Sequence, residues 1–171
     1  FGKLVGRTSL MLVAALVGGV ATAVVVVALL GGGLTLLVPF IGFLCLMGIS
    51  FVAVGIGISA ASASDSRATV IAVGIYIIFV TLWNLIQGGI VEAATALGLV
   101  KTGGQPAWLQ FINMLPPNQA AVAAYQSAVS GGRVFAADPF ASVWFPVLLL
   151  FGWMVAPVVG GYVQFRDADI G

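Results

Sequence analysis

The chain has 171 residues, of which 61% are hydrophobic and only 6% are charged, and its mean hydropathy is +1.21. Soluble domains are about 45–50% apolar, and so little polar side chain could not cover a water-soluble fold of this size. The composition therefore indicates a protein whose main solvent is the lipid bilayer. The net charge is +1 and no basic patch is present, which excludes nucleic acid as a partner.

Groups that carry catalysis are scarce in this sequence. It contains no histidine, and its single cysteine, Cys45, lies inside an apolar run. It lacks the GxxxxGK[ST] loop that cradles nucleotide phosphates. Without histidine, neither a Ser–His protease site nor a His/Glu zinc site can form, and the apolar runs hold no pair of aspartates for an aspartic protease site. We therefore expect no catalytic residue, metal site or cofactor in this chain.

Four apolar runs are long enough to cross a bilayer as helices, which takes about 20 residues each. They cover residues 9–30, 34–58, 68–85 and 142–162. Prolines within the second and fourth runs are expected to kink helices that neighbouring helices support: Pro39, Pro146 and Pro157. We predict an all-α, polytopic transmembrane helix bundle with four spans, in which residues 1–171 form a single transmembrane domain.

Small residues recur at four-residue spacing in the first two runs. Such columns let helix backbones approach closely in lipid. The candidate packing positions are Gly18, Gly19, Ala53, Gly57 and Ala61. Two interpretations remain open, namely a helix interface that slides or dimerises, and ordinary packing within one chain.

The long connection between the third and fourth runs, residues 86–141, has predicted structure of its own. Residues 107–115 place apolar side chains, among them Trp108, at close to helical spacing, which favours a short helix in the membrane interface. Pro116 and Pro117 end it. Asn118 is expected to cap a second, alanine-rich helix that stops near Gly131. We expect that second helix on the outer surface of the bundle, as a lid over a path or as a structural cap.

The distribution of basic residues predicts the orientation. If the spans alternate, four of the six basic residues fall on one side of the membrane: Lys3, Arg7, Arg67 and Arg166. Only Lys101 and Arg133, both in the long connection, fall on the other side. The positive-inside rule then places the N- and C-terminal ends in the cytoplasm and residues 86–141 outside it.

Three stretches resemble the ABC-2 type transporter permeases. GKLVGR (2–7), directly before a glycine-containing span, is similar to the segment that leads into the third helix of that family. GIGISAASASDSRATVIAVGIYIIF (55–79) resembles its fourth and fifth helices. LPPNQAAVAAY (115–125) and GGYVQFRDADI (160–170) resemble its extracytoplasmic helical region and its closing pattern. The resemblance covers nearly the whole chain and depends on the order of the motifs.

This resemblance implies an export machine assembled from several chains. Two permease copies, identical or different, would pair, and separate ABC ATPase subunits would bind ATP and Mg²⁺ on the cytoplasmic side. This chain would supply the last four of six helices and so be the C-terminal part of a longer permease. The residues left to contact the ATPase would be Lys3, Arg7, Ser62, Asp65 and Arg67. The Ala-, Val- and Gly-rich composition with little Lys points to a GC-rich prokaryotic genome, and the resemblance then implies the plasma membrane of a prokaryote.

Other function classes fit less well, and one alternative stays open. A secondary carrier predicts internal repeats and an ionisable group in mid-membrane, and the spans show neither. A polytopic scaffold or assembly subunit without transport activity would share the same composition, and the presence of an ATPase partner would separate the two. The substrate is open among lipids, drugs, peptides and polysaccharide precursors.

Overall fold

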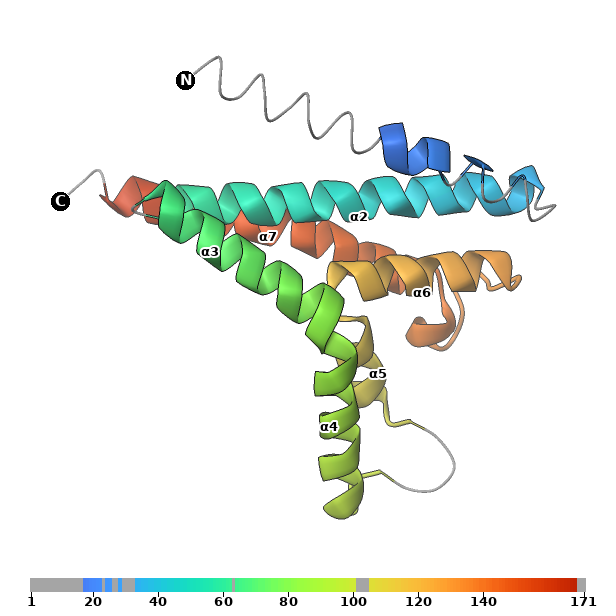
Figure 1. Cartoon of the computed structure of the whole chain (residues 1–171). Helices are drawn as coiled ribbons and strands as arrows, with labels where there is room; N and C mark the ends of the chain where they lie inside the picture. Colours follow the sequence, from blue (N-terminus) through green and yellow to red (C-terminus); the bar gives the residue numbers. More distant parts are fainter. Residues whose placement is uncertain are drawn as a thin grey trace.

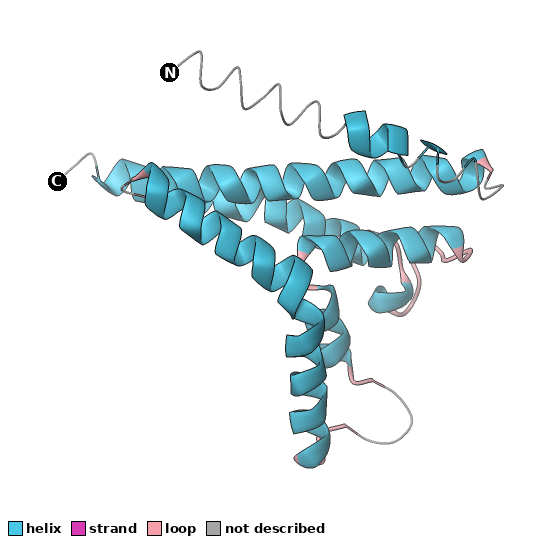
Figure 2. Cartoon of the chain, in the orientation of Figure 1, coloured by secondary structure: helices cyan, strands magenta, loops and turns pink. Residues whose placement is uncertain are grey.

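The computed structural model describes residues 17–22, 24–25, 28, 33–62, 64–100 and 105–168, and this part of the chain is helical with connecting loops (Figure 2). Two long helices, α2 (Leu34–Ala61) and α7 (Trp144–Ala168), lie beside each other (Figure 1). Between them in sequence come α3 (Asp65–Tyr76), a π-helical segment η1 (Ile77–Leu82), α4 (Trp83–Ala96), α5 (Ala107–Met114), α6 (Pro117–Val129) and a short 3₁₀ turn η2 (Pro139–Ala141). The predicted all-α class is confirmed for the described residues.

Three helices in the described part of the chain are long and apolar enough to cross a membrane: Thr35–Ala61, Asp65–Ala96 and Trp144–Gln164. They correspond to the second, third and fourth predicted spans. The first predicted span, residues 9–30, lies mostly outside the described residues. Large apolar side chains point outward from these helices, for example Val70 and Val155, which are 69% and 57% exposed. Such faces suit lipid or another apolar helix, and the chain is a membrane protein.

The best-packed part of the molecule lies where α2, α6 and α7 meet. Leu150 and Ala120 are fully buried there, against the partly buried Phe43 and Met47 of α2. The fully buried Ser50 shares its hydroxyl proton between the Leu46 carbonyl of its own helix, at 2.8 Å, and the Leu150 carbonyl of α7, at 3.2 Å. Helix α2 is thereby fixed against α7 both by packing and by a hydrogen bond.

The third span differs from its prediction at both ends. The helix begins at Asp65, not near residue 68, because the Ser64 hydroxyl accepts a hydrogen bond from the Arg67 amide and caps it. It also continues through η1 to Ala96, so the prediction that a loop begins at residue 86 is wrong. The polar residues after residue 85 recur at helical spacing, as expected for one stripe of a helix. In Figure 1, α4 points away from α2 after the π segment.

The two helices of the long connection are confirmed, with one correction at their junction. Pro116, not Asn118, is the N-cap of α6, and Pro117 occupies its first turn, where the missing N–H costs nothing. The Asn118 amide instead donates to the Phe79 carbonyl in η1, at 3.2 Å. Gly131, with φ +74°, follows the C-cap of α6, as predicted.

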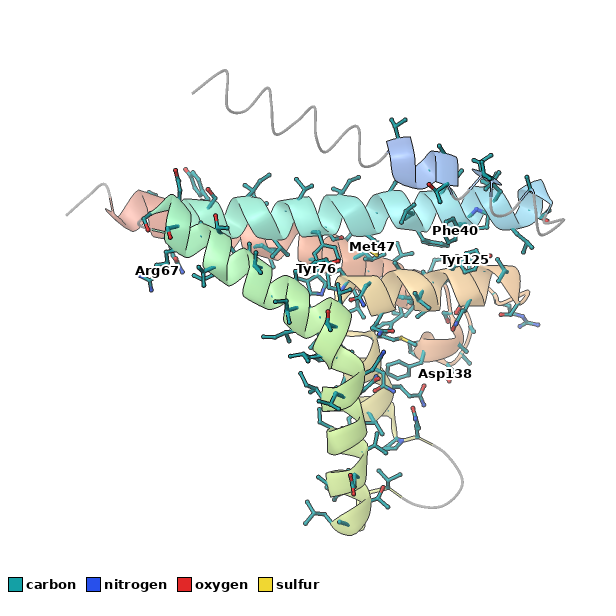
Figure 3. The ribbon with its side chains drawn as sticks, viewed as in Figure 1. Phe40, Met47, Arg67, Tyr76, Tyr125 and Asp138 are labelled. Carbon is teal, nitrogen blue, oxygen red and sulfur yellow. The ribbon has the colours of Figure 1, made fainter. Side chains whose placement is uncertain are left out.

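Helix α6 packs along the flanks of α2 and α7, near the ends of these helices that the predicted orientation places outside the cytoplasm. Ala120 and Ala124 are fully buried in that contact. The Tyr125 ring meets the Phe40 ring of α2 edge-on at 5.6 Å (Figure 3). Small alanine side chains allow this close approach, so α6 forms a third wall of the bundle.

Helix α7 starts two residues later than predicted and extends beyond residue 162 to Ala168. Ser142, expected as the start of the span, is fully buried in the preceding turn, where its hydroxyl donates to the Asp138 carbonyl at 2.8 Å. Pro146 therefore falls in the first turn of α7 and requires no kink, which corrects the prediction made for it. Pro157 lies in the helix interior, as predicted.

Candidate functional site

The turn between α2 and α3 and the C-terminal part of α7 lie at the same end of the molecule. Helices α2 and α7 run in the same direction: Ser50 bonds to Leu150, and seven residues further along α2, Gly57 lies against Pro157. Figure 1 shows the C-terminal end beside the start of α3. The structure thus brings the turn and the predicted cytoplasmic end of the last helix onto one face.

That turn carries three of the residues predicted to contact a partner. Ser62 ends α2 and is half-buried, with its amide bonded to the Ser59 carbonyl at 3.3 Å. Asp65 and Arg67 are exposed on the first turn of α3 (Figure 3 labels Arg67), where the helix dipole favours the Asp65 carboxylate. The turn therefore offers one carboxylate and one guanidinium to a partner. Lys3 and Arg7 lie outside the described residues.

Close backbone contact joins α2 to α7 along a seam that includes Gly57 and Gly161. A Cβ atom added to Gly57 would meet the Pro157 carbonyl group, with its carbon at 2.6 Å, and one added to Gly161 would lie 2.9 Å from the Gly57 Cα. Ala53, one turn before Gly57, is 6% exposed. This favours packing within one chain at these positions.

The other candidate packing positions do not share that seam. Ala61 is exposed at the end of α2. Gly18 and Gly19 are exposed as well, and a Cβ atom added at either would meet nothing within 4 Å. A role for these three residues in contact with another chain stays a prediction.

A second junction ties α7 to the middle of the chain. The indole N–H of Trp153 donates to the Leu115 carbonyl at 2.6 Å, directly before the Pro116–Pro117 pair. The Phe79 ring of η1 packs edge-on against the Trp153 ring at 5.3 Å. Together with the Asn118 bond to the Phe79 carbonyl, these contacts link η1, the α5–α6 turn and α7. π-Helical segments occur frequently at functional sites, and here the Asn118 side chain satisfies one carbonyl of the irregular backbone.

A polar cleft between α4 and α5 was missed by the sequence analysis. It has a volume of about 370 Å³ and is lined by Asn84, Gln87, Gly88, Val91, Glu92, Gln105 and Asn113. The α4 members recur at spacings of three and four residues, so they form one stripe along the helix. That periodicity was readable from the sequence, but residues after 85 were interpreted as a loop.

Hydrogen bonds organise the rim of this cleft. Asn113 donates from Nδ2 to Gln105 Oε1 at 3.2 Å, and Gln119 donates from Nε2 to Asn84 Oδ1 at 3.3 Å. Asn113 Oδ1 is enclosed and has no hydrogen-bond partner. Among the described residues no group of three or more His, Cys, Asp or Glu side chains could hold a metal ion. The cleft therefore offers hydrogen bonds and one carboxylate.

Comparison with known proteins assigns the family. The model of the ABC-2 family transporter proteins matches residues 1–170. Searches among proteins of curated function and among solved structures found no match. The family match covers nearly the whole chain and agrees with its apolar helices, three of which are long enough to span a membrane. The chain thus belongs to the ABC-2 family of transporter membrane proteins.

Proposed function

We propose that this chain is the membrane-spanning permease subunit of an ATP-driven ABC exporter. The observation that carries the proposal is the family match over residues 1–170. Membrane subunits of this family are normally not catalytic, and the sequence has no nucleotide-binding loop of its own. ATP and Mg²⁺ would accordingly bind in a separate ATPase subunit, and this chain would form part of the translocation path.

The ATPase is proposed to dock at the α2–α3 turn, on the face that also carries the end of α7. Asp65 and Arg67 are exposed there, and charged groups of both signs can fix the orientation of a partner. The positive-inside rule supports a cytoplasmic location for this face. Lys3 and Arg7 are proposed to add to the same contact.

A displacement of the α2–α3 turn would be transmitted to the helices within the membrane. The turn joins the ends of α2 and α3, so a displacement there moves both helices. The Gly57 seam couples α2 to α7, whose Trp153 is bonded to the α5–α6 turn. Backbone contacts at the seam cannot rotate away as side chains can, which favours movement of α2 and α7 as a unit. A displacement of the turn by the ATPase would thereby reach α6, which packs against both α2 and α7.

The complete transporter is proposed to contain a second permease copy, identical or different, in the plasma membrane of a prokaryote. The strongly exposed apolar faces of α2, α3 and α7 are available to lipid or to that copy. The proposal retains residues 9–30 as a fourth span, with both ends of the chain in the cytoplasm.

Cysteine cross-linking tests the docking face. In a full-length protein with Cys45 replaced by Ala, Ser66→Cys places a thiol on the exposed first turn of α3. Val134→Cys is the matched control, since Val134 is 59% exposed in the loop between α6 and α7. A thiol cross-linker in native membranes should join the Ser66→Cys variant, and not the control, to a nucleotide-binding ATPase.

The same experiment separates the transporter from the scaffold. Reproducible cross-linking of Ser66→Cys to a different membrane complex, with no ATPase captured, would support a non-transport assembly subunit. Cross-linking of the ATPase from Val134→Cys alone would refute the proposed docking face.

A further inference from the structure

Helix α4 leaves the direction of the span that it continues. The π segment η1 ends at Leu82, whose φ of −92° and ψ of −12° depart from the values of a regular helix, about −63° and −42°. π-Bulges bend helices, and the Asn118 side chain supports this one at the Phe79 carbonyl, at 3.2 Å. In Figure 1, α4 runs across the direction of α2 and α7. The helix from α3 to α4 therefore has two arms that meet at η1.

The first arm alone is long enough to cross the membrane. Helix α3 and η1 hold 12 and 6 residues, which at about 1.5 Å per residue reach about 27 Å, close to the roughly 30 Å of a hydrocarbon core. The whole helix Asp65–Ala96, with 32 residues, would reach about 48 Å if it were straight. Helix α4 therefore begins near the membrane face opposite the α2–α3 turn.

The exposed surface of α4 is divided lengthwise into a polar and an apolar side. Three exposed polar residues recur at helical spacing on one side: Asn84, Glu92 and Thr95. On the other side, apolar residues recur at spacings of four, three and four, ending just after the helix: Ile86, Ile90, Ala93 and Leu97. A helix with two such sides lies in the plane of a membrane interface, with its apolar side among the acyl chains.

Two other placements suit this surface less well. If α4 projected into water, its apolar side would lose its solvent, since Leu97 is 74% exposed. If α4 continued through hydrocarbon, the exposed Glu92 carboxylate would lie in lipid, which is costly. Helix α5, which faces α4 across the cleft, adds Trp108, 40% exposed, and tryptophan is enriched at membrane interfaces.

We propose that α4 lies in the plane of the membrane interface, on the face opposite the α2–α3 turn. Its apolar side, with Ala93 and Leu97, contacts acyl chains, and its polar side, with Glu92 and Thr95, contacts headgroups and water. Of the helix Asp65–Ala96, only α3 and η1 then cross the hydrocarbon core. This placement goes beyond the proposed exporter function and does not depend on an ATPase.

Spin labels on α4 test the placement in the full-length protein, reconstituted into phospholipid vesicles in a cysteine-free background. The probes are Ala93→Cys and Thr95→Cys, two exposed positions on opposite sides of α4. Electron paramagnetic resonance measures depth from collisions with oxygen, which concentrates in lipid, and with a water-soluble nickel chelate. Ala93→Cys should collide more with oxygen and Thr95→Cys more with the chelate, and their depths should differ by about 10 Å, the width of a helix.

Two exposed positions outside α4 calibrate the measurement. Val70→Cys on α3, 69% exposed, reports lipid, and Val134→Cys in the loop before α7, 59% exposed, reports water. A helix along the membrane normal would separate the two α4 labels by only about 3 Å in depth. If both α4 labels matched Val134→Cys, α4 would project into water, and if both matched Val70→Cys, the span would continue through α4. Either result, equal depths or the reverse pattern would overturn the proposal.

Discussion

Gly57→Ala should destabilise the protein by forcing α2 away from α7. An added Cβ atom would meet the Pro157 carbonyl group, with its carbon at 2.6 Å and the Pro157 Cβ at 2.9 Å. These distances are shorter than real contacts, and two of the atoms involved belong to backbone. No rotamer change can therefore relieve the clash, and one of the two helices has to shift.

The magnitude follows from a comparison with Gly55→Ala in the same helix, where a Cβ atom would meet nothing within 4 Å. Both variants gain the helix propensity of alanine, about 0.8–1.0 kcal/mol, so this gain cancels in the difference. Overpacking costs about 1–3 kcal/mol. At about 2–4 °C per kcal/mol for a chain of this size, the melting temperature of Gly57→Ala should lie about 2–12 °C below that of Gly55→Ala.

Thermal unfolding of the detergent-purified full-length protein, followed by circular dichroism or tryptophan fluorescence, measures this difference. Both variants should be compared at the same detergent and protein concentrations, because assembly shifts the apparent stability. Equal melting temperatures for the two alanine variants would refute the close backbone contact at the seam.

Three further outcomes are expected. Trp153→Phe keeps an aromatic ring but removes the pyrrole part of the indole and its 2.6 Å hydrogen bond to the α5–α6 turn. In denaturant titration it should lower the free energy of unfolding by at least the value of the hydrogen bond, about 0.5–1.5 kcal/mol, whereas Trp108→Phe, at a 40% exposed position of α5, should change it less. Ser64→Ala removes the N-cap of α3 and should cost about 0.5–2 kcal/mol, whereas Ser66→Ala should cost much less; equal losses would contradict the capping assignment. In intact cells and a cysteine-free background, a membrane-impermeant maleimide should label Val134→Cys and not Ser66→Cys, and the reverse pattern would contradict the orientation.

Much of the fold follows from simple features of the sequence. Uncharged runs of about 20 residues required membrane helices, and the helices α2 and α7 lie where two of those runs were predicted. Gly131 was readable as the end of α6 because glycine commonly follows the last residue of a helix, and its φ of +74° agrees with that role. These features are local, so one sequence was enough to identify them.

What the sequence did not reveal depends on contacts between distant segments. Asn118 looked like an N-cap, yet its side chain bonds to Phe79, 39 residues earlier, because the adjacent prolines already form the start of α6. The position of α6 along α2 depends on the fit of Ala120 and Ala124 against neighbouring helices, which no local pattern encodes. The polar stripe along α4 differs, because its helical periodicity is present in the sequence, although the residues after 85 were interpreted as a loop.

The central claim is that this chain works with a separate ATPase, and co-purification tests it most directly. The full-length protein should be isolated gently from its native membrane, and its companions identified and quantified by mass spectrometry. The account predicts a nucleotide-binding ATPase in near equal amount, in a complex that hydrolyses ATP. Reproducible isolation without any ATPase, and with another membrane complex in its place, would contradict it.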